Sequence, residues 1–143
     1  MGATRSRSAE KAYGKQRKAE AGDACVFCAI TPSSEQYVGA TNSFKVIKNI
    51  YGYSYWDGQA VAEHLMITPN AHTDTLAYMT NAQKVEFLDL LTKYETSGYN
   101  VYARAPGSIR KTIHHQHTHL IKPKGKPFKL LFYLERPYFR FLR

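Results

Sequence analysis

The sequence predicts a single α+β domain built on an antiparallel sheet, with one long helix and one short helix. Short strand candidates follow one another closely along the chain, and one long helical segment lies among them. The length of 143 residues suits one domain with a sizeable core, and no repeat or interdomain linker divides it. Together these three observations favour the α+β class.

Residues 1–23 differ in composition from the rest of the chain. They are rich in Lys, Arg, Ala, Ser and Glu and poor in large apolar side chains, a composition typical of flexible segments. We therefore expect a flexible basic arm over residues 1–23, helical only transiently, with order beginning near Ala24.

The two cysteines of the chain, Cys25 and Cys28, form a C-x-x-C pair. No apolar run reaches the roughly 20 residues of a membrane span and no secretory signal is present, so we expect a soluble cytoplasmic protein. In such a protein the pair favours metal binding or redox chemistry over a structural disulfide. A redox pair usually lies in a βαβ unit, which is not predicted here, whereas histidines elsewhere could complete a zinc site.

Two strands are predicted in the first half of the ordered region. Residues 44–50 form one candidate, and residues 64–68 form another, which Pro69 ends. The aromatic, glycine-containing segment 51–58 between them is predicted to be a loop. Its rings either pack beneath the loop or form a stacking surface for a base.

The long helix is predicted over residues 82–96. Thr80 is a suitable N-cap residue, and Gly98 is suited to the position after the last turn. Residues 99–103 are a third strand candidate, and a turn at 105–108 follows. The face of the helix directed at the core is predicted to carry Val85, Leu88, Leu91 and Thr92, widened by Phe87 and Leu90.

Three histidines, His115, His117 and His119, alternate along the next segment. Successive side chains of a strand point to opposite faces, so a strand here would place all three on one face, about 6.6 Å apart. Apolar residues flank the run at Ile113 and at 120–121, which favours such a strand over an exposed histidine-rich metal tract. The middle imidazole could then be oriented by its neighbours, bind a metal or move a proton.

The net charge of +9 is carried by the two ends of the chain. Residues 1–23 have a net charge of +3 and residues 122–143 a net charge of +6, whereas residues 24–121 are neutral. Such basic ends favour polyanionic partners, although a solvated basic surface has the same composition. In the extension 123–143 aromatic residues alternate with basic ones, so this segment either stacks on nucleic acid or packs onto the domain or a dimer partner.

Several motifs together resemble the histidine triad family of nucleotide hydrolases and transferases. Residues 115–121 resemble its His-φ-His-φ-His-φ-φ signature, where φ is apolar. Residues 25–28 resemble the Cys-φ-Phe-Cys of its zinc-bearing members, 64–72 its His-φ-φ-φ-φ-Pro-x-x-His, and 98–100 precede the triad by the usual distance. The resemblance covers residues 25–122 and implies a catalytic domain at 24–122 with the family's fold. Two φ positions of the triad depart from the pattern, namely Gln116 and Thr118.

The resemblance implies a nucleotide phosphoester or phosphoramidate hydrolase. His117 would attack the α-phosphate and form a nucleotidyl–histidine intermediate, while a backbone carbonyl would keep its other ring nitrogen protonated. His119 would contact the phosphate or the leaving group and help to move a proton. The transferase branches carry Gln in place of His119, so this residue favours hydrolysis. The alternatives are a nucleotidyltransferase or dinucleoside polyphosphate phosphorylase, and a nucleic-acid-binding module with a vestigial triad.

The resemblance also implies a zinc site and a homodimer. Cys25, Cys28, His72 and His115 match the ligands of the zinc-bearing members, and a closed set of two thiolates and two imidazoles describes a structural zinc. His64 is expected to pack or to form a hydrogen bond.

Five further residues match substrate-binding positions of the family. Asn49 falls where relatives contact the ribose, and Thr112 matches the Ser/Thr of the phosphate loop. Relatives usually have Asn, Gly and Gln where this chain has Arg104, Arg110 and Lys111. These cations either bind a longer phosphate chain or mark an altered site, and neither the substrate nor its leaving group can be read from the sequence.

Overall fold

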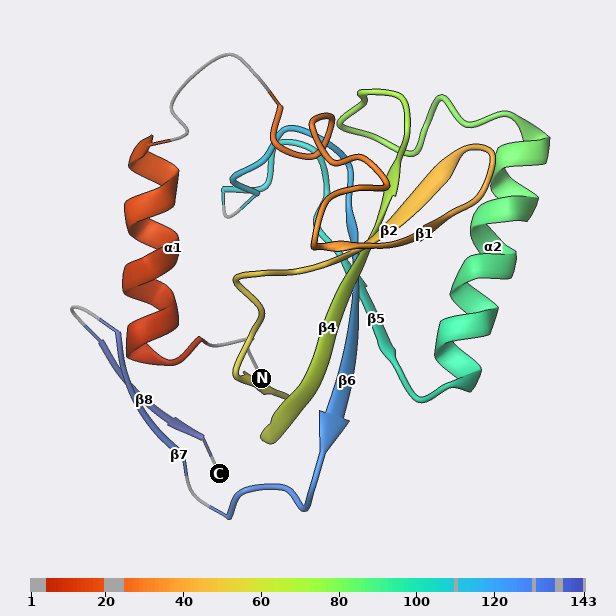
Figure 1. Ribbon diagram of the computed structural model, residues 1–143. Helices are drawn as coiled ribbons and strands as arrows, with labels where there is room; N and C mark the ends of the chain where they lie inside the picture. The colour runs from red at the N-terminus through yellow and green to blue at the C-terminus, as the bar shows by residue number, and fades with distance from the viewer. Residues whose placement is uncertain (1–4, 20–24, 110, 130, 136–137, 143) are drawn as a thin grey trace.

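The computed structural model describes residues 5–19, 25–109, 111–129, 131–135 and 138–142. Its core is a six-stranded antiparallel sheet with a long helix on one face and a second helix on the opposite side (Figure 1). This architecture confirms the predicted α+β class. The sheet has the order β1-β2-β4-β6-β5 with β3 paired to β4, from β1 (Tyr37–Ala40), β2 (Phe44–Lys48), β3 (Tyr55–Trp56), β4 (Gln59–Pro69), β5 (Asn100–Ala103) and β6 (Thr118–Lys124).

Strand register divides the sheet into two chemically different faces. Leu65 lies opposite Leu120, and both are buried on the face that the long helix α2 (Asn81–Thr96) covers. Met66 lies opposite His119 on the other face, which His64 shares because side chains alternate along β4. The histidine-bearing face is therefore the one turned away from α2.

The ends of α2 confirm the predicted boundaries. Thr80 is the N-cap: its hydroxyl accepts a hydrogen bond from the Gln83 N–H, and its own N–H donates one to Oε1 of the Gln83 side chain. This reciprocal pair satisfies two amide groups that the first turn would otherwise leave unpaired. Gly98 follows the helix with φ of +85°, a conformation that glycine adopts at little cost.

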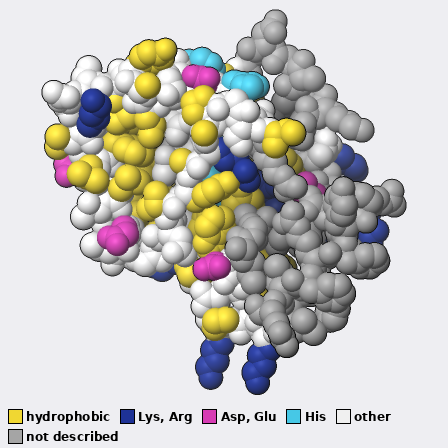
Figure 2. Space-filling model, turned by 180° about the vertical axis from the view of Figure 1, so that it is seen from behind, with side chains coloured by type: hydrophobic (Ala, Val, Ile, Leu, Met, Phe, Trp, Pro, Cys, Tyr) yellow, Lys and Arg dark blue, Asp and Glu magenta, His cyan; other side chains and the backbone are white. Residues whose placement is uncertain are grey.

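The face that α2 directs at the sheet agrees with the predicted one at Phe87, Leu90 and Leu91 and differs from it at Val85 and Leu88. Val85 and Leu88 are both 61% exposed, and hydrophobic side chains gather on the side of the molecule where α2 lies (Figure 2). The helix is rotated because Phe87 packs against Phe44, with ring centroids 5.4 Å apart. The residues that face the sheet are Phe87, Leu90, Leu91 and Tyr94, which follow the i, i+3, i+4, i+7 spacing of one helical face.

The two ends of the chain also form regular structure. The segment predicted to be a flexible arm contains α1 (Arg7–Ala19), and Arg5 and Tyr13 contact the domain. Mobility of the arm stays a prediction, as do the boundaries of the catalytic domain. The C-terminal extension forms a separate two-stranded sheet from β7 (Leu131–Glu135) and β8 (Tyr138–Leu142), whose aromatic side chains lie outside the described part. Among the described helices, α1 and α2 are both too short or too polar to cross a membrane.

Candidate active site and metal cluster

The triad does not lie wholly in a strand, contrary to the prediction. Strand β6 begins at Thr118, so only His119 belongs to it, and His115 and His117 precede it. The reason is the loop after β4, which hydrogen-bonds the preceding segment: the Gln116 N–H donates to the Thr73 carbonyl at 2.6 Å. The histidines nevertheless converge, and the ring centroids of His117 and His119 are 5.0 Å apart.

His117 has a defined tautomer. Its Nδ1 lies 2.7 Å from the carbonyl oxygen of His115, and because a carbonyl only accepts, Nδ1 must carry the proton. The remaining nitrogen, Nε2, then holds a free electron pair. Burial lowers the pKa of His117, and the nearby cations of Lys111 and Arg104 act in the same direction, against the hydrogen bond to His115. His117 is therefore a neutral imidazole with an unprotonated Nε2 at neutral pH.

His64 transmits a similar constraint from the backbone to His119. The Tyr53 N–H donates to Nδ1 of His64 at 3.0 Å, so the proton of this neutral ring lies on Nε2. That nitrogen is 2.9 Å from Nδ1 of His119 and donates to it. His119 therefore carries its own proton on Nε2. His119 is thus a neutral hydrogen-bond donor, and it lies beside the neutral ring of His117, whose Nε2 has a free electron pair.

Burial is the main reason why both rings stay neutral. It lowers the pKa of His64 to about 3, with a further contribution from the charge of Arg5. Burial likewise holds the pKa of His119 well below its usual value, followed in effect by His64 and His117. The expectation that His64 packs or forms a hydrogen bond agrees with this geometry, but no motif indicated that its partner is the last histidine of the triad.

Asn49 lies next to this pair of rings. Its Oδ1 accepts from the Tyr51 N–H at 3.0 Å, and its Nδ2 lies 3.3 Å from Nε2 of His64. Because the His64 nitrogen already carries a proton directed at His119, Asn49 cannot also donate to it. The Nδ2 group of the half-buried Asn49 is thus available for another partner beside His64.

The four predicted metal ligands lie together. The nitrogen and sulfur atoms of Cys25, Cys28, His72 and His115 all lie within 4.8 Å of one another, so the cluster could hold a metal ion. Sγ of Cys25 and Nδ1 of His115 are 3.3 Å apart, and Sγ of Cys28 is 3.4 Å from Nδ1 of His72. A tetrahedral zinc with usual bond lengths would separate sulfur from nitrogen by about 3.6 Å. The donor set and these two sulfur–nitrogen distances therefore fit zinc.

The second ring nitrogen of His115 supports the same assignment. Nε2 donates to the Pro69 carbonyl at 3.0 Å, which leaves Nδ1 unprotonated and directed at the cysteines. Metal-ligating histidines characteristically have such an outer hydrogen bond. His115 thus joins the two sites, since its ring faces the cluster and its carbonyl orients His117.

The predicted cationic residues have different surroundings. The guanidinium of Arg104 lies 5.2 Å from the ring centroid of Tyr102, which itself stacks on His119. Lys111 is buried, and its ammonium donates to the Asp74 carbonyl at 2.6 Å and to Oε1 of Gln116 at 3.1 Å. Arg110 lies outside the described residues.

Thr112, the predicted phosphate-loop residue, comes directly after the buried Lys111 in sequence but is itself exposed. Its hydroxyl forms a hydrogen bond with the hydroxyl of Tyr13. Both Lys111 and Thr112 therefore belong to one loop that is tied to the triad through Gln116. Lys111 in this loop and Arg104 place two positive charges near His117, although residues 24–121 as a whole are neutral.

Solved structures share this fold. A HIT family hydrolase from Legionella pneumophila superposes with a TM-score of 0.52 at 17% identity, over 74% of this chain and 98% of that one. A HIT family hydrolase from Clostridium thermocellum gives a TM-score of 0.53 at 20% identity, over 77% and 99% of the two chains. At these identities the likeness establishes the fold alone.

Sequence comparison decides the family. No protein-family model matches the chain. The adenosine 5'-monophosphoramidase HNT1 of Candida albicans is 32% identical over 115 residues, which cover 71% of this chain and 72% of that protein. The chain belongs to the histidine triad family. The adenosine 5'-monophosphoramidase HNT1 of Saccharomyces cerevisiae is a second relative, 30% identical over 76% of this chain and 68% of its own length.

Proposed function

We propose that this chain hydrolyses nucleotide phosphoramidates and phosphoesters at the α-phosphate through a nucleotidyl–His117 intermediate. The observation that carries the proposal is the His117 tautomer, in which the His115 carbonyl leaves Nε2 unprotonated. Two curated relatives named as adenosine 5'-monophosphoramidases support the same substrate class.

The reaction has two half-reactions. Nε2 of His117 forms a bond to phosphorus while the bond from phosphorus to the leaving nitrogen or oxygen breaks. The N–H of His119 donates a hydrogen bond to the leaving atom or a phosphoryl oxygen, where negative charge develops. Water then attacks phosphorus and breaks the P–N bond to His117. The leaving amine takes one proton from solvent as its bond to phosphorus breaks, and the attacking water later gives one proton back to solvent, so the protein returns to its starting state.

We assign His119 to hydrogen bonding rather than to carrying a positive charge. Full protonation would place a proton on Nδ1, where His64 already donates. His64 cannot reverse its donor, because the Tyr53 N–H occupies its other nitrogen. The hydrogen-bond chain thus favours the neutral donor form.

Zinc is the metal that we propose for the cysteine and histidine cluster, in a structural role. A closed set of two thiolates and two imidazoles suits zinc and leaves no ligand position for substrate. When bound, it would fix the segment that contains Cys25 and Cys28 to the triad through His115.

We further propose that Arg104 contacts the charged part of the substrate and that Lys111 holds the loop. Arg104 lies over the ring that stacks on His119. Lys111 already donates to two protein oxygens and is buried. Asn49, Arg110 and Thr112 remain our candidates for the ribose and phosphate contacts.

A homodimer and a cytoplasmic location also belong to this proposal, with weak nucleic-acid binding by the basic ends. For the dimer, β5 is an edge strand of the sheet, and Val101 on it is 42% exposed. Val85 and Leu88 add apolar surface on the neighbouring helix. A second copy of the chain could pair with this edge and cover the apolar side chains.

Replacement of the nucleophile is the first test. His117→Ala should lower kcat/KM for adenosine 5'-monophosphoramidate by several orders of magnitude, because it removes the ring nitrogen that attacks phosphorus. His114→Ala is the matched control, since His114 is exposed in the same segment and should leave turnover unchanged. Retention of more than a few per cent of the rate by His117→Ala would refute the assignment. Adding inorganic phosphate, and looking for a nucleoside diphosphate product, distinguishes a phosphorylase.

Metal content tests the zinc proposal without reference to activity. Protein purified without added metal should contain one zinc per chain by elemental analysis. The double variant Cys25→Ser and Cys28→Ser should lose it and unfold at lower temperature, because a structural zinc contributes directly to folding. His114→Ala should keep the metal. Full zinc content in the double variant would contradict the ligand assignment.

A comparison of two substrates should distinguish the role of Arg104 from that of Lys111. Arg104→Gln should raise KM for a dinucleoside polyphosphate about tenfold or more, and much less for the monophosphoramidate, because it removes a charge-assisted contact to the longer anion. Lys111→Met should impair both substrates alike and lower the thermal stability, since it leaves Asp74 and Gln116 oxygens unpaired. If Arg104→Gln impairs both substrates equally, Arg104 holds the loop as Lys111 does and does not select the substrate.

A further inference from the structure

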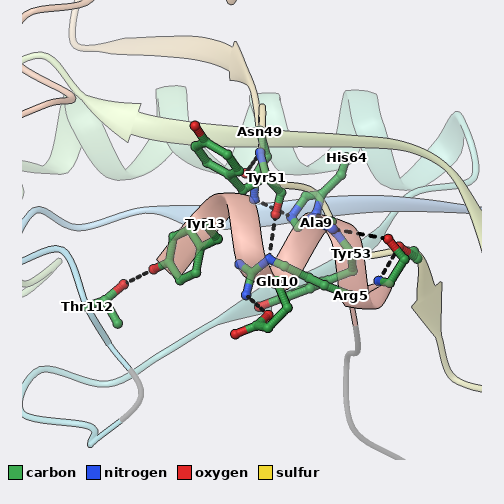
Figure 3. Close-up of polar contacts among 11 residues, drawn as sticks. Arg5, Ala9, Glu10, Tyr13, Asn49, Tyr51, Tyr53, His64 and Thr112 are labelled. Atoms are coloured by element: carbon green, nitrogen blue, oxygen red, sulfur yellow. Dashed lines mark hydrogen bonds and ion pairs between the residues drawn. The ribbon is translucent and has the colours of Figure 1, made fainter. Parts of the chain in front are cut away.

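Arg5, which lies just before α1, is fixed onto the loop that flanks the histidines. Nε of Arg5 donates to the Tyr51 carbonyl at 2.7 Å, and the Arg5 side chain is only 16% exposed. Its guanidinium carbon lies 4.2 Å from the ring centroid of Tyr13 and 5.1 Å from that of Tyr53 (Figure 3). A cation enclosed by two aromatic rings and a carbonyl holds α1 against this loop.

This attachment lies directly beside the proposed catalytic rings. The Ser6 N–H donates to the Ser54 hydroxyl at 2.7 Å, on the same loop. The ring of Tyr53 is 4.7 Å from His64 and 5.7 Å from His119 between centroids. The first turn of α1 therefore begins next to the face of the sheet that carries the histidines.

Tyr13 forms the second attachment, at the phosphate loop. Its ring lies 5.6 Å from that of Tyr51, and its hydroxyl hydrogen-bonds to the hydroxyl of Thr112 (Figure 3). The two residues are 99 positions apart in sequence. Helix α1 thus connects the loop at Tyr51 to the loop that contains Lys111 and Thr112.

The direction of this hydroxyl pair follows from what a phosphate requires. A phosphate oxygen only accepts, so Thr112 must donate its single proton to bind it. The Thr112 oxygen can then accept from Tyr13, because a phenol hydroxyl is in general a stronger hydrogen-bond donor than an alcohol hydroxyl. In the resulting chain of hydrogen bonds Tyr13 donates to Thr112 and Thr112 donates to the phosphate, so that each hydrogen bond polarises the next.

We propose that Tyr13 is a positioning residue for the phosphate, acting through Thr112. Its hydroxyl fixes the rotation of the Thr112 hydroxyl so that the Thr112 proton points at the substrate. Helix α1 is then a part of the substrate site that residues 24–122 alone do not supply. The inference rests on the proposed function, because Thr112 contacts phosphate only if the chain binds a nucleotide there.

Tyr13→Phe tests the hydroxyl alone, because it keeps the ring against Arg5 and Tyr51. It should lower kcat/KM for adenosine 5'-monophosphoramidate about three- to tenfold, mainly through KM, the range expected for one neutral hydrogen bond. The affinity for AMP, measured by calorimetry, should fall by a similar factor. Tyr51→Phe, which removes a hydroxyl from the neighbouring ring, is the matched control and should change neither quantity.

A double-mutant cycle distinguishes positioning from a general effect on packing. In a Thr112→Ala background, Tyr13→Phe should have no further effect, whereas in Thr112→Ser, which retains a hydroxyl, its effect should persist. Additive losses in the Thr112→Ala background would overturn the proposal.

Three other results would each overturn the role proposed for Tyr13. Wild-type turnover in Tyr13→Phe would overturn the proposal and leave the proposed function intact. An increase in turnover would overturn it in favour of an inhibitory α1 that competes with phosphate for Thr112. A wild-type protein that neither turns over the phosphoramidate nor binds AMP would refute the proposed function, and this inference with it.

Discussion

The antiparallel pairing of β4 with β6 is the constraint on which both sites depend. The register that sets Met66 opposite His119 also brings His64 within hydrogen-bonding distance of His119. The end of the same strand supplies the Pro69 carbonyl that orients His115. A shift of one residue would move every side chain of β6 to the opposite face, and His119 would then point at α2. The burial of Leu65, Ile67 and Leu120 under α2 opposes such a shift, so packing on one face fixes the chemistry of the other.

Two backbone groups determine where the protons of three imidazoles lie. The His115 carbonyl places the proton of His117 on Nδ1, and the Tyr53 N–H places the proton of His64 on Nε2, which in turn sets that of His119. Burial keeps these rings uncharged, since it is the main cause of the lowered pKa of each. The site is therefore arranged before substrate binds, with an electron pair on one ring and a donor N–H on the next. Such preorganisation is what electrostatic catalysis requires.

The sequence predicted the parts of this arrangement that depend on local patterns. The triad, the cysteine pair with His72, and the caps of α2 at Thr80 and Gly98 each occupy fixed spacings, and the structure brings the four predicted metal ligands together. The predictions that were wrong depended on contacts between residues far apart in the sequence. The hydrogen bond from Gln116 to Thr73 delays the start of β6, and the packing of Phe87 on Phe44 rotates α2 so that Val85 and Leu88 face outward. The partner of His64 follows only from strand register, and the contact between Tyr13 and Thr112 joins residues 99 positions apart.

The tautomer of His117 is the most direct test of this account, because the proposed nucleophile exists only if Nε2 is unprotonated. Nitrogen-15 NMR of histidine-labelled protein at neutral pH distinguishes protonated from unprotonated ring nitrogens. The account predicts a proton on Nδ1 of His117 and on Nε2 of both His64 and His119. It also predicts that His64 stays neutral well below pH 6.5, the usual histidine pKa, because burial lowers its pKa to about 3. A proton on Nε2 of His117, or a His64 that titrates near the usual value, would contradict it.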